Sequence, residues 1–209
     1  MRCPIHREGF FFTSVLFVVA FIASRISRTL GWFFSFLAAF TMYFFRDPER
    51  VIPTGEGLIV SPADGKIIGI DQVDSVPNLN GPAKRVTIFL SIFDVHLNRA
   101  PIEGKVIYRQ YTPGKFFPAN VPKASNDNEK NSIIIEDGNF RVLVRQIAGI
   151  IARRILCWSN PGDLLERGER FGLIRFGSRT ELFLPLEAQI TVQVGQKVRG
   201  GETIIGNRS

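Results

Sequence analysis

Two glycine-bounded segments near the C-terminus resemble each other: GDLLERGERFG at residues 162–172 and GQKVRGGETIIG at residues 195–206. Each segment places a Gly-Glu pair six residues after its first glycine, and each closes on a further glycine. Glycines at such spacing around short apolar stretches are typical of tight turns between strands. Two hairpin units with matching turns predict a pseudo-symmetric β-barrel or β-sandwich.

The chain from residue 51 to residue 209 has the composition of a single, mainly β domain. Its short apolar runs contain β-branched residues and are separated by Gly, Pro, Asn and Asp. The paired turns favour a hammerhead-like element similar to that of biotinyl and lipoyl carrier domains, and the turn SPADG at residues 61–65 fits it. The polar stretch 119–131 is predicted to be a surface loop. The apolar runs lie at residues 58–60, 66–70, 85–92, 104–108, 132–136, 140–147 and 189–194.

The first fifty residues differ in composition from the rest of the chain. Eleven of the 19 phenylalanines lie between Phe10 and Phe45, in two uncharged runs at residues 9–24 and 29–45. Runs of this length are at or just under the length that crosses about 30 Å of hydrocarbon as a helix. A buried hairpin in a soluble protein is the alternative, but the chain is too short to bury two such runs.

We therefore predict a hydrophobic α-helical hairpin for residues 1–50, in or across a membrane, and a β domain for residues 51–209. Whether the hairpin spans the membrane or is only embedded in it is left open. The basic residues at its tip weaken the positive-inside argument for its orientation. The arginines expected on the side of the main domain are Arg2, Arg7, Arg46 and Arg50.

The formal net charge of +7 at pH 7 suggests an anionic partner, either nucleic acid or lipid. The arginines are dispersed and lack the aromatic interleaving of a nucleic-acid-binding module, so no nucleic acid is expected as a partner. The two cysteines, Cys3 and Cys157, cannot form a disulfide framework and agree with a reduced, cytoplasmic setting. No second His or Cys has ligand spacing, so no metal site is predicted.

Catalytic candidates are few, because the chain has two histidines. His6 precedes the first apolar run, and His96 lies in the segment FDVHLNRAP at residues 93–101. A lone histidine is more often structural than catalytic. A Ser-His-Asp arrangement with Asp64 or Asp94 is nevertheless compatible with the sequence, because such triads are recognised by geometry and not by spacing.

A Gly-Ser pair, Gly177-Ser178, follows an apolar run in the segment FGLIRFGSRTEL at residues 171–182. Most Gly-Ser pairs are turns between strands. Together with other motifs in the same order, this pair resembles the phosphatidylserine decarboxylases, and most closely their short bacterial and archaeal branch. The resemblance runs from about residue 44 to residue 206. The other motifs are FRDP at 45–48, SPADG at 61–65, DVHLNRAP at 94–101, RRILCW at 153–158 and the Gly-Asp run from 162.

Members of this family are made as proenzymes that cut themselves before the serine of the Gly-Ser pair. The resemblance implies a cut that leaves a β chain of residues 1–177 and an α chain of residues 178–209, which stay associated. It implies that Ser178 becomes a covalent pyruvoyl cofactor. The implied reaction converts phosphatidylserine to phosphatidylethanolamine and CO₂ through a Schiff base on the pyruvoyl group, at the cytoplasmic face of the cell membrane.

The resemblance also implies which residues activate the serine. His96 is expected to take the proton of Ser178, and Asp64 to fix the orientation and tautomer of His96. Many relatives have a second histidine at the position of Arg99. In this chain either His96 serves both maturation and later protonation, or the base for self-cleavage is arranged differently.

Three residues near His96 are candidates for substrate binding. Asp94 is an alternative orienting acid, and Asn98 an oxyanion or substrate contact. Arg99 is a candidate donor to the lipid phosphate, because its planar guanidinium suits bidentate contacts.

Two other classes of function are alternatives to the enzyme. The first is a non-catalytic, membrane-anchored β domain that binds lipid or acts as a scaffold. The second is a lipoylated or biotinylated carrier, for which Lys66 is the nearest modifiable lysine. A homo-oligomer is left open, as is the choice between ester-linked and ether-linked lipids.

Overall fold

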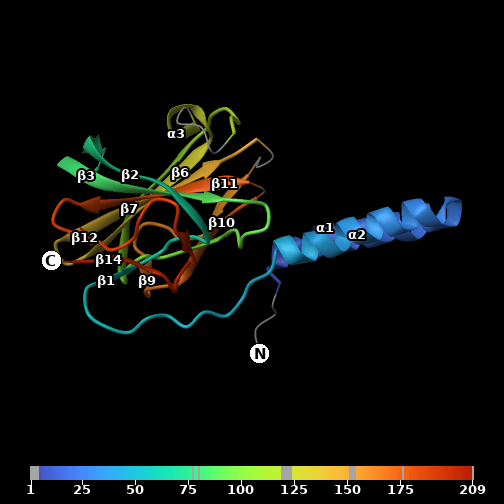
Figure 1. Cartoon of the computed structure of the whole chain (residues 1–209), viewed down its shortest axis with the longest axis horizontal. Helices are drawn as coiled ribbons and strands as arrows, with labels where there is room; N and C mark the ends of the chain where they lie inside the picture. The colour runs from blue at the N-terminus through green and yellow to red at the C-terminus, as the bar shows by residue number, and fades with distance from the viewer. Residues whose placement is uncertain are drawn as a thin grey trace. The chain divides into compact units, whose positions relative to one another are not determined.

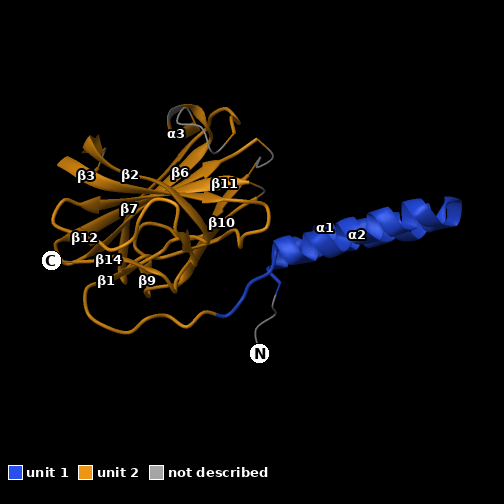
Figure 2. Cartoon of the chain, viewed as in Figure 1, with its two compact units in different colours: residues 1–49 blue, residues 50–209 orange. Residues whose placement is uncertain are grey.

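The chain forms two compact units, which divide between Glu49 and Arg50 (Figure 2). The computed structural model describes residues 5–76, 78–79, 81–118, 124–150, 154–175 and 177–208, so Arg2 and Cys3 lie outside the described residues. A pair of apolar helices makes up the first unit, and the second is mainly β-strand, which confirms the fold class predicted from the sequence.

The first unit is a hairpin of α1 (Arg7–Ile26) and α2 (Arg28–Phe44), joined at the extended residue Ser27. Small residues let the two helices approach closely. A Cβ at Gly31 would lie 2.7 Å from the Cβ of Ser24, a distance that side chains do not tolerate. The residues buried between the helices are mostly small: Gly9, Thr13, Ala20 and Ala23 of α1, and Gly31, Ala38, Thr41 and Phe44 of α2.

The outer surface of the hairpin is apolar. The side chains of Phe11, Phe21, Trp32 and Phe36 are each about two-thirds exposed or more. By length and composition α1 could cross a membrane, whereas α2 has 17 residues. A helix pair that is apolar on its outside as well as at its contact is typical of a membrane environment.

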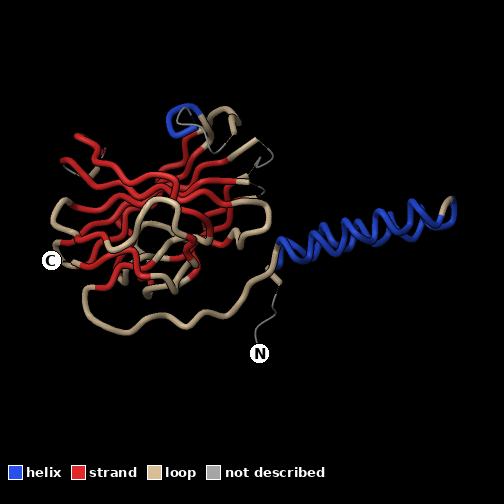
Figure 3. Tube along the Cα trace, in the orientation of Figure 1, coloured by secondary structure: helices blue, strands red, loops and turns tan. Residues whose placement is uncertain are grey.

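A curled sheet of eight strands, shaped as a half-barrel, forms the body of the second unit (Figures 1 and 3). All neighbouring strands in this sheet are antiparallel. In spatial order they are β13 (Lys197–Val198), β2 (Gly65–Val76), β3 (Gly81–Leu90), β11 (Ser178–Pro185), β7 (Phe140–Ala148), β6 (Lys130–Asp137), β5 (Gly104–Thr112) and β9 (Leu164–Leu165).

Two three-stranded sheets accompany the half-barrel. The first consists of β1 (Leu58–Val60), β14 (Ile204–Asn207) and β12 (Gln189–Ile190). The second consists of β4 (Leu97–Arg99), β10 (Arg170–Ile174) and β8 (Ile155–Cys157). The remaining helix, α3 (Ala124–Asp127), is one turn long.

Side chains alternate between the two faces of β11, and both faces are buried. Leu182 and Leu184 belong to the large hydrophobic core, whereas Phe183 packs in a separate cluster with Leu143 and Ala83. A strand covered on both faces has a strongly specified register, because a shift by one residue would exchange the two sets of side chains. The position of Ser178 at the start of β11 is therefore well determined.

The two similar glycine-bounded segments, 162–172 and 195–206, correspond to a structural repeat. Gly162 and Gly195 both adopt positive φ, at 105° and 94°, and so do Gly168 and Gly201, at 78° and 81°. Each member of a pair makes the same backbone hydrogen bond. Gly162 N donates to Val106 O at 2.7 Å and Gly195 N to Ile67 O at 2.8 Å, while Gly168 N and Gly201 N donate to Ala100 O and Ser61 O at 2.8 Å.

These hydrogen bonds align a second pair of segments that were not matched from the sequence. SPADGKI at residues 61–67 is equivalent to APIEGKV at residues 100–106. Gly65 and Gly104 occupy the same place in the two turns, with φ of 151° and 148°. The half-barrel is thus built from two similar halves, in which Asp64 of one turn corresponds to Glu103 of the other.

Residues 119–131 do not form one surface loop, which corrects the sequence-based expectation. Residues 119–123 lie outside the described part of the chain, α3 follows, and β6 begins at Lys130. Asn128 is buried, and its amide nitrogen donates to Phe117 O at 2.8 Å and to Ala148 O at 2.7 Å. The polar composition reflects buried side chains with partners, not exposure to solvent.

Replacement of Gly104 by alanine tests the repeat. A Cβ at this position would lie 2.3 Å from the backbone oxygen of Glu136, and φ is positive, so both strain and overlap oppose it. We expect Gly104→Ala to lower the free energy of unfolding by about 2–4 kcal/mol, measured by denaturant titration in detergent. The control is Gly69→Ala, whose Cβ would meet Thr87 at an ordinary 3.8 Å. Equal effects of the two changes would contradict the assignment.

Candidate active site

Ser178 is the first residue of the central strand β11. Its backbone pairs with Leu90 of β3 on one side and with Ala148 of β7 on the other. The side chain is fully buried, and its Oγ has no hydrogen-bond partner among the described residues. A buried hydroxyl without a partner is unfavourable by about 1–3 kcal/mol, so a functional use of this group is favoured over a structural one.

Gly177 supplies the conformational freedom next to the serine. Its φ is +51°, and a Cβ built on it would meet nothing within 4 Å. A Cβ would therefore fit here, and the positive φ is the feature that favours glycine. The carbonyl carbon of Gly177 is the atom that an attacking Ser178 Oγ must reach.

His96 lies in the connection between β3 and β4, and it is almost fully buried. Its Nδ1 is 3.0 Å from the carbonyl oxygen of Asp94. Because a carbonyl oxygen can only accept, Nδ1 carries the proton and Nε2 is the basic nitrogen of the neutral ring. The carbonyl oxygen of His96 accepts from Ile174 N at 3.1 Å, which fixes His96 beside β10. Ile174 lies four residues before Ser178 in the sequence.

A buried amide network connects the two segments that carry Ser178 and His96. Asn98 Nδ2 donates to Thr180 Oγ1 at 3.0 Å, and Gln146 Nε2 donates to Asn98 Oδ1 at 2.8 Å. Ser178 and His96 each lie two residues before one partner of the Asn98–Thr180 hydrogen bond. The structure therefore brings these two predicted residues into the same region, and it gives Asn98 a well-defined structural contact.

Asp94 stabilises the turn that leads to His96. Its Oδ2 accepts from both the backbone nitrogen and the Oγ of Ser91, at 2.8 Å each. The contact with His96 is made by the main chain of Asp94, whereas its carboxylate holds the turn, so orientation of His96 by the Asp94 carboxylate stays a prediction. A direct role of the Asp94 carboxylate in substrate binding stays a prediction.

Asp64 makes its hydrogen bonds to two groups, Arg50 and Gly200, that the sequence did not assign to the site. Arg50 Nη2 lies 2.7 Å from Asp64 Oδ2, and Gly200 N donates to Oδ1 at 2.8 Å. Burial raises the pKa of Asp64 above its usual range, although Arg50 and the Gly200 N–H lower it. The negative charge of Asp94 also raises this pKa, so the two carboxylates lie close enough to interact. The orientation of His96 by Asp64 stays a prediction.

Arg99 is buried, and its guanidinium has a structural partner. Nη1 donates to Gly168 O at 2.9 Å, in one of the two repeated turns, and its backbone nitrogen donates to Pro62 O. This contact stabilises the fold. Its role toward a lipid phosphate stays a prediction.

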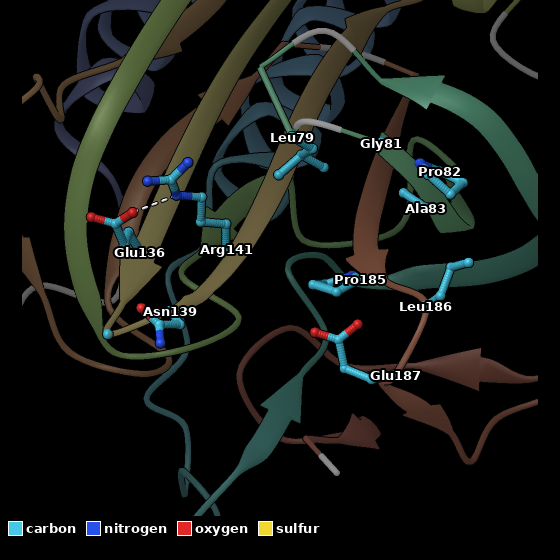
Figure 4. A pocket seen from close by; sticks show the side chains of 11 residues that line it. Leu79, Gly81, Pro82, Ala83, Glu136, Asn139, Arg141, Pro185, Leu186 and Glu187 are labelled. Atoms are coloured by element: carbon cyan, nitrogen blue, oxygen red, sulfur yellow. Dashed lines mark hydrogen bonds and ion pairs between the residues drawn. The ribbon is translucent and has the colours of Figure 1, made fainter.

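A separate cavity of about 480 Å³ lies at the other end of β11, beyond Pro185 (Figure 4). The β6–β7 turn and the start of β3 also line it, and an ion pair between Glu136 and Arg141 forms part of its wall. The candidate catalytic residues do not contribute to this cavity.

Three residues of the site were not predicted from the sequence. Thr180 and Gln146 belong to the buried amide network, and Arg50 binds Asp64. Thr180 could have been found from the alternation that places it on the same face as Ser178. Nothing in the local sequence distinguishes Gln146 or Arg50 from other polar residues on strands and linkers.

Comparisons with known proteins agree with each other. The family model for phosphatidylserine decarboxylase matches residues 37–206 of this chain. The phosphatidylserine decarboxylase proenzyme of Symbiobacterium thermophilum is 48% identical over 208 residues, which cover 99% of this chain and 97% of the relative. The matched span includes every residue of the candidate site.

Substitution of Gln146 tests the buried network. Gln146→Leu leaves Asn98 Oδ1 and the Asn131 amide without their partner, and each such loss costs about 1–3 kcal/mol. We expect a loss of about 2–4 kcal/mol in unfolding free energy by denaturant titration. Gln72→Leu, on an exposed position of β2, is the control and should change stability by less than about 0.5 kcal/mol. A neutral Gln146→Leu would contradict the network.

Proposed function

The chain belongs to the phosphatidylserine decarboxylase family, and on this premise we propose that it is a self-processing, pyruvoyl-dependent enzyme. It would convert phosphatidylserine to phosphatidylethanolamine and CO₂. The single observation that carries the proposal is the buried hydroxyl of Ser178, which has no partner among the described residues and follows the glycine of the family motif. Family membership makes the chain a decarboxylase and disfavours the non-catalytic scaffold.

In the proposed maturation, Ser178 Oγ attacks the carbonyl carbon of Gly177. The C–N bond between the two residues breaks and an ester forms, with the Ser178 nitrogen taking up a proton. His96 Nε2 is the candidate base for the hydroxyl proton, since its Nδ1 is already engaged with a carbonyl oxygen. Loss of the Ser178 α-proton then expels the Gly177 carboxylate, and hydrolysis of the resulting enamine releases ammonia.

The Ser178 position fits a pyruvoyl group, because this small group needs the buried space that the serine already occupies. The chemistry that such a group supplies is an electron sink, through a Schiff base to the substrate amine, for the pair released with CO₂. The protein residues must then orient the substrate and return a proton. His96 is the titratable side chain in the described connection from β3 to β4 that suits this transfer.

A membrane location is part of the proposal. The exposed apolar surface of α1 and α2 supports insertion in a bilayer, where a phospholipid substrate resides. The excess of arginine supports attraction to an anionic cytoplasmic surface, at about 1 kcal/mol for each well-placed charge.

Ser178→Ala tests the maturation step. The wild-type chain of 23.5 kDa should appear as two polypeptides, whereas the variant should stay whole, because alanine has no nucleophile. Intact mass spectrometry should find a 178–209 fragment lighter than the seryl peptide by one ammonia. Vesicles that contain phosphatidylserine should release CO₂ with the wild type only.

The matched control is Ser159→Ala, a buried serine elsewhere in the β unit, which should be cut normally. Cleavage of the Ser178→Ala chain at the same bond would refute the mechanism. A wild-type chain that stays whole after folding in membranes would refute the proposed function.

A pair of charges on the hairpin tests its membrane insertion. Phe17 and Phe36 lie near the centres of their helices with exposed rings. Lysine at both positions should cost about 2.5–3.5 kcal/mol each in a bilayer and move the protein from the carbonate-resistant membrane fraction to the soluble one. Phe93→Lys, at an exposed phenylalanine of the β unit, should leave the distribution unchanged. Retention of the doubly charged variant would contradict insertion.

A further inference from the structure

Arg50, the first residue of the β unit, joins two acidic side chains from distant parts of the sequence. Its Nη2 lies 2.7 Å from Asp64 Oδ2 and its Nη1 lies 3.2 Å from Glu202 Oε2. The guanidinium is almost fully buried. The backbone nitrogen of Val51 donates to the other oxygen of Glu202 at 3.3 Å. The Glu202 carboxylate thus binds the Arg50 side chain with one oxygen and the backbone of the next residue with the other.

The structural repeat provides an internal reference for this arrangement. Glu103, the counterpart of Asp64, is half exposed, and its nearest basic partner is Arg167 at 3.7 Å. Asp64 is 14% exposed and receives a short contact from Arg50 and a backbone hydrogen bond from Gly200. An acidic residue at this turn is therefore common to both halves, but its burial against an arginine is not.

Glu202, the second acidic partner of Arg50, also differs from its counterpart in the other half. Glu169, the counterpart of Glu202, accepts from Glu166 N at 2.8 Å and so closes its own turn. In the other half the equivalent N–H, from Arg199, donates to Thr203 Oγ1 at 2.9 Å instead. Because Thr203 accepts this hydrogen bond in place of the glutamate, the Glu202 carboxylate can bind Arg50.

We propose that Arg50 is a positioning residue of the enzyme, which holds the Asp64 carboxylate in place through its bridge to Glu202. This inference rests on the proposed function and adds a residue to it. Asp64 and Arg50 belong to the proposed β chain, whereas Glu202 and Gly200 belong to the proposed α chain. The bridge would therefore hold the two chains together at the carboxylate after the cut.

The charges around Asp64 determine the expected pH dependence. Arg50 from the linker and the N–H of Gly200 stabilise the ionised carboxylate, whereas burial and Asp94, from the turn before His96, oppose it. Glu202 faces Arg50 and also lies 3.7 Å from Arg199. Removal of Arg50 takes away an effect that lowers the pKa of Asp64, whereas burial and the charge of Asp94 still raise it. The pKa of Asp64 therefore rises further. A reaction that needs ionised Asp64 then loses rate at a higher pH than before.

The test is the pH dependence of self-cleavage in the full-length chain. Wild type, Arg50→Gln and Arg50→Lys are synthesised in a cell-free system with phospholipid vesicles, moved to buffers of different pH, and followed by denaturing electrophoresis. For Arg50→Gln we expect the acid limb of the rate profile to move to higher pH. At a pH below that limb, cleavage slows about tenfold for every pH unit that the limb moves, and the rate recovers in alkaline buffer. Arg50→Lys should restore most of the wild-type profile.

Two further variants separate positioning from general stability. Glu202→Gln keeps Arg50 but weakens its anchor, and should move the limb in the same direction by a smaller amount. Arg167→Gln removes the arginine that lies beside Glu103 in the other half and should leave the limb in place, whatever its effect on stability. If Arg50→Gln fails to fold, Glu202→Gln decides the matter, and an unchanged limb in that variant overturns the inference.

The outcomes distinguish this inference from the function on which it rests. A wild type that is cut normally, with an unchanged limb in Arg50→Gln, overturns the role of Arg50 and leaves the enzyme intact. An equal loss of rate at every pH, without rescue by lysine, shows a structural role only and also overturns it. A wild type that is never cut overturns the proposed function and this inference together.

Discussion

The central position of β11 is the constraint on which the rest of the structure depends. Its ladders to β3 and β7 both begin at Ser178, and its side chains are buried from Ser178 to Leu184. A strand held along both edges does not rely on the peptide bond that precedes it, because its hydrogen bonds and its buried area lie within the sheet. The cut that we propose at the first residue of β11 would therefore not release the strand. Ser178, the serine proposed to react, thus lies in a strand that is paired along both edges.

Ion pairs of Glu181, on the face of β11 opposite to Ser178, stabilise the centre of the sheet. The fully buried carboxylate of Glu181 lies 4.0 Å from Arg85 of β3, 3.4 Å from Arg145 of β7 and 3.8 Å from Arg179 of β11 itself. Breaking a buried ion pair by removing one partner costs about 3–5 kcal/mol, since it leaves an uncompensated charge. Burial lowers the pKa of Arg145, with the negative charge of Glu181 opposing the effect. The three central strands are thus linked by charge as well as by their backbone ladders.

The fold class and the region of the site could be predicted from the sequence, but the contacts of the site could not. Period-two runs and glycine turns identify strands because those signals are local, and the paired glycines near residues 168 and 201 are structurally equivalent. The match between residues 61–67 and 100–106 is hard to see in the sequence, since only the proline, the glycine and the lysine are identical. Residues 119–131 have the composition of a loop, and composition does not reveal that Asn128 has buried partners. The bridge from Arg50 to Glu202 spans most of the chain, and no local pattern encodes a contact at that separation.

The two similar halves do not yield two sites, and chain connectivity explains why. In the sheet, β7 and β11 occupy equivalent central places, with β6 and β3 beside them. A tight turn at Gly138 joins β6 directly to β7, so the first residue of β7 is fixed by its own hairpin. β11 is reached instead from β10, which belongs to another sheet, and the connection ends at Gly177, where a Cβ would meet nothing within 4 Å. Of these two strands, only β11 begins with a residue that is fully buried, paired on both edges and preceded by a glycine outside any tight hairpin. The symmetry of the fold supplies the scaffold, and the difference in connection distinguishes the bond at which we propose that the chain is cut.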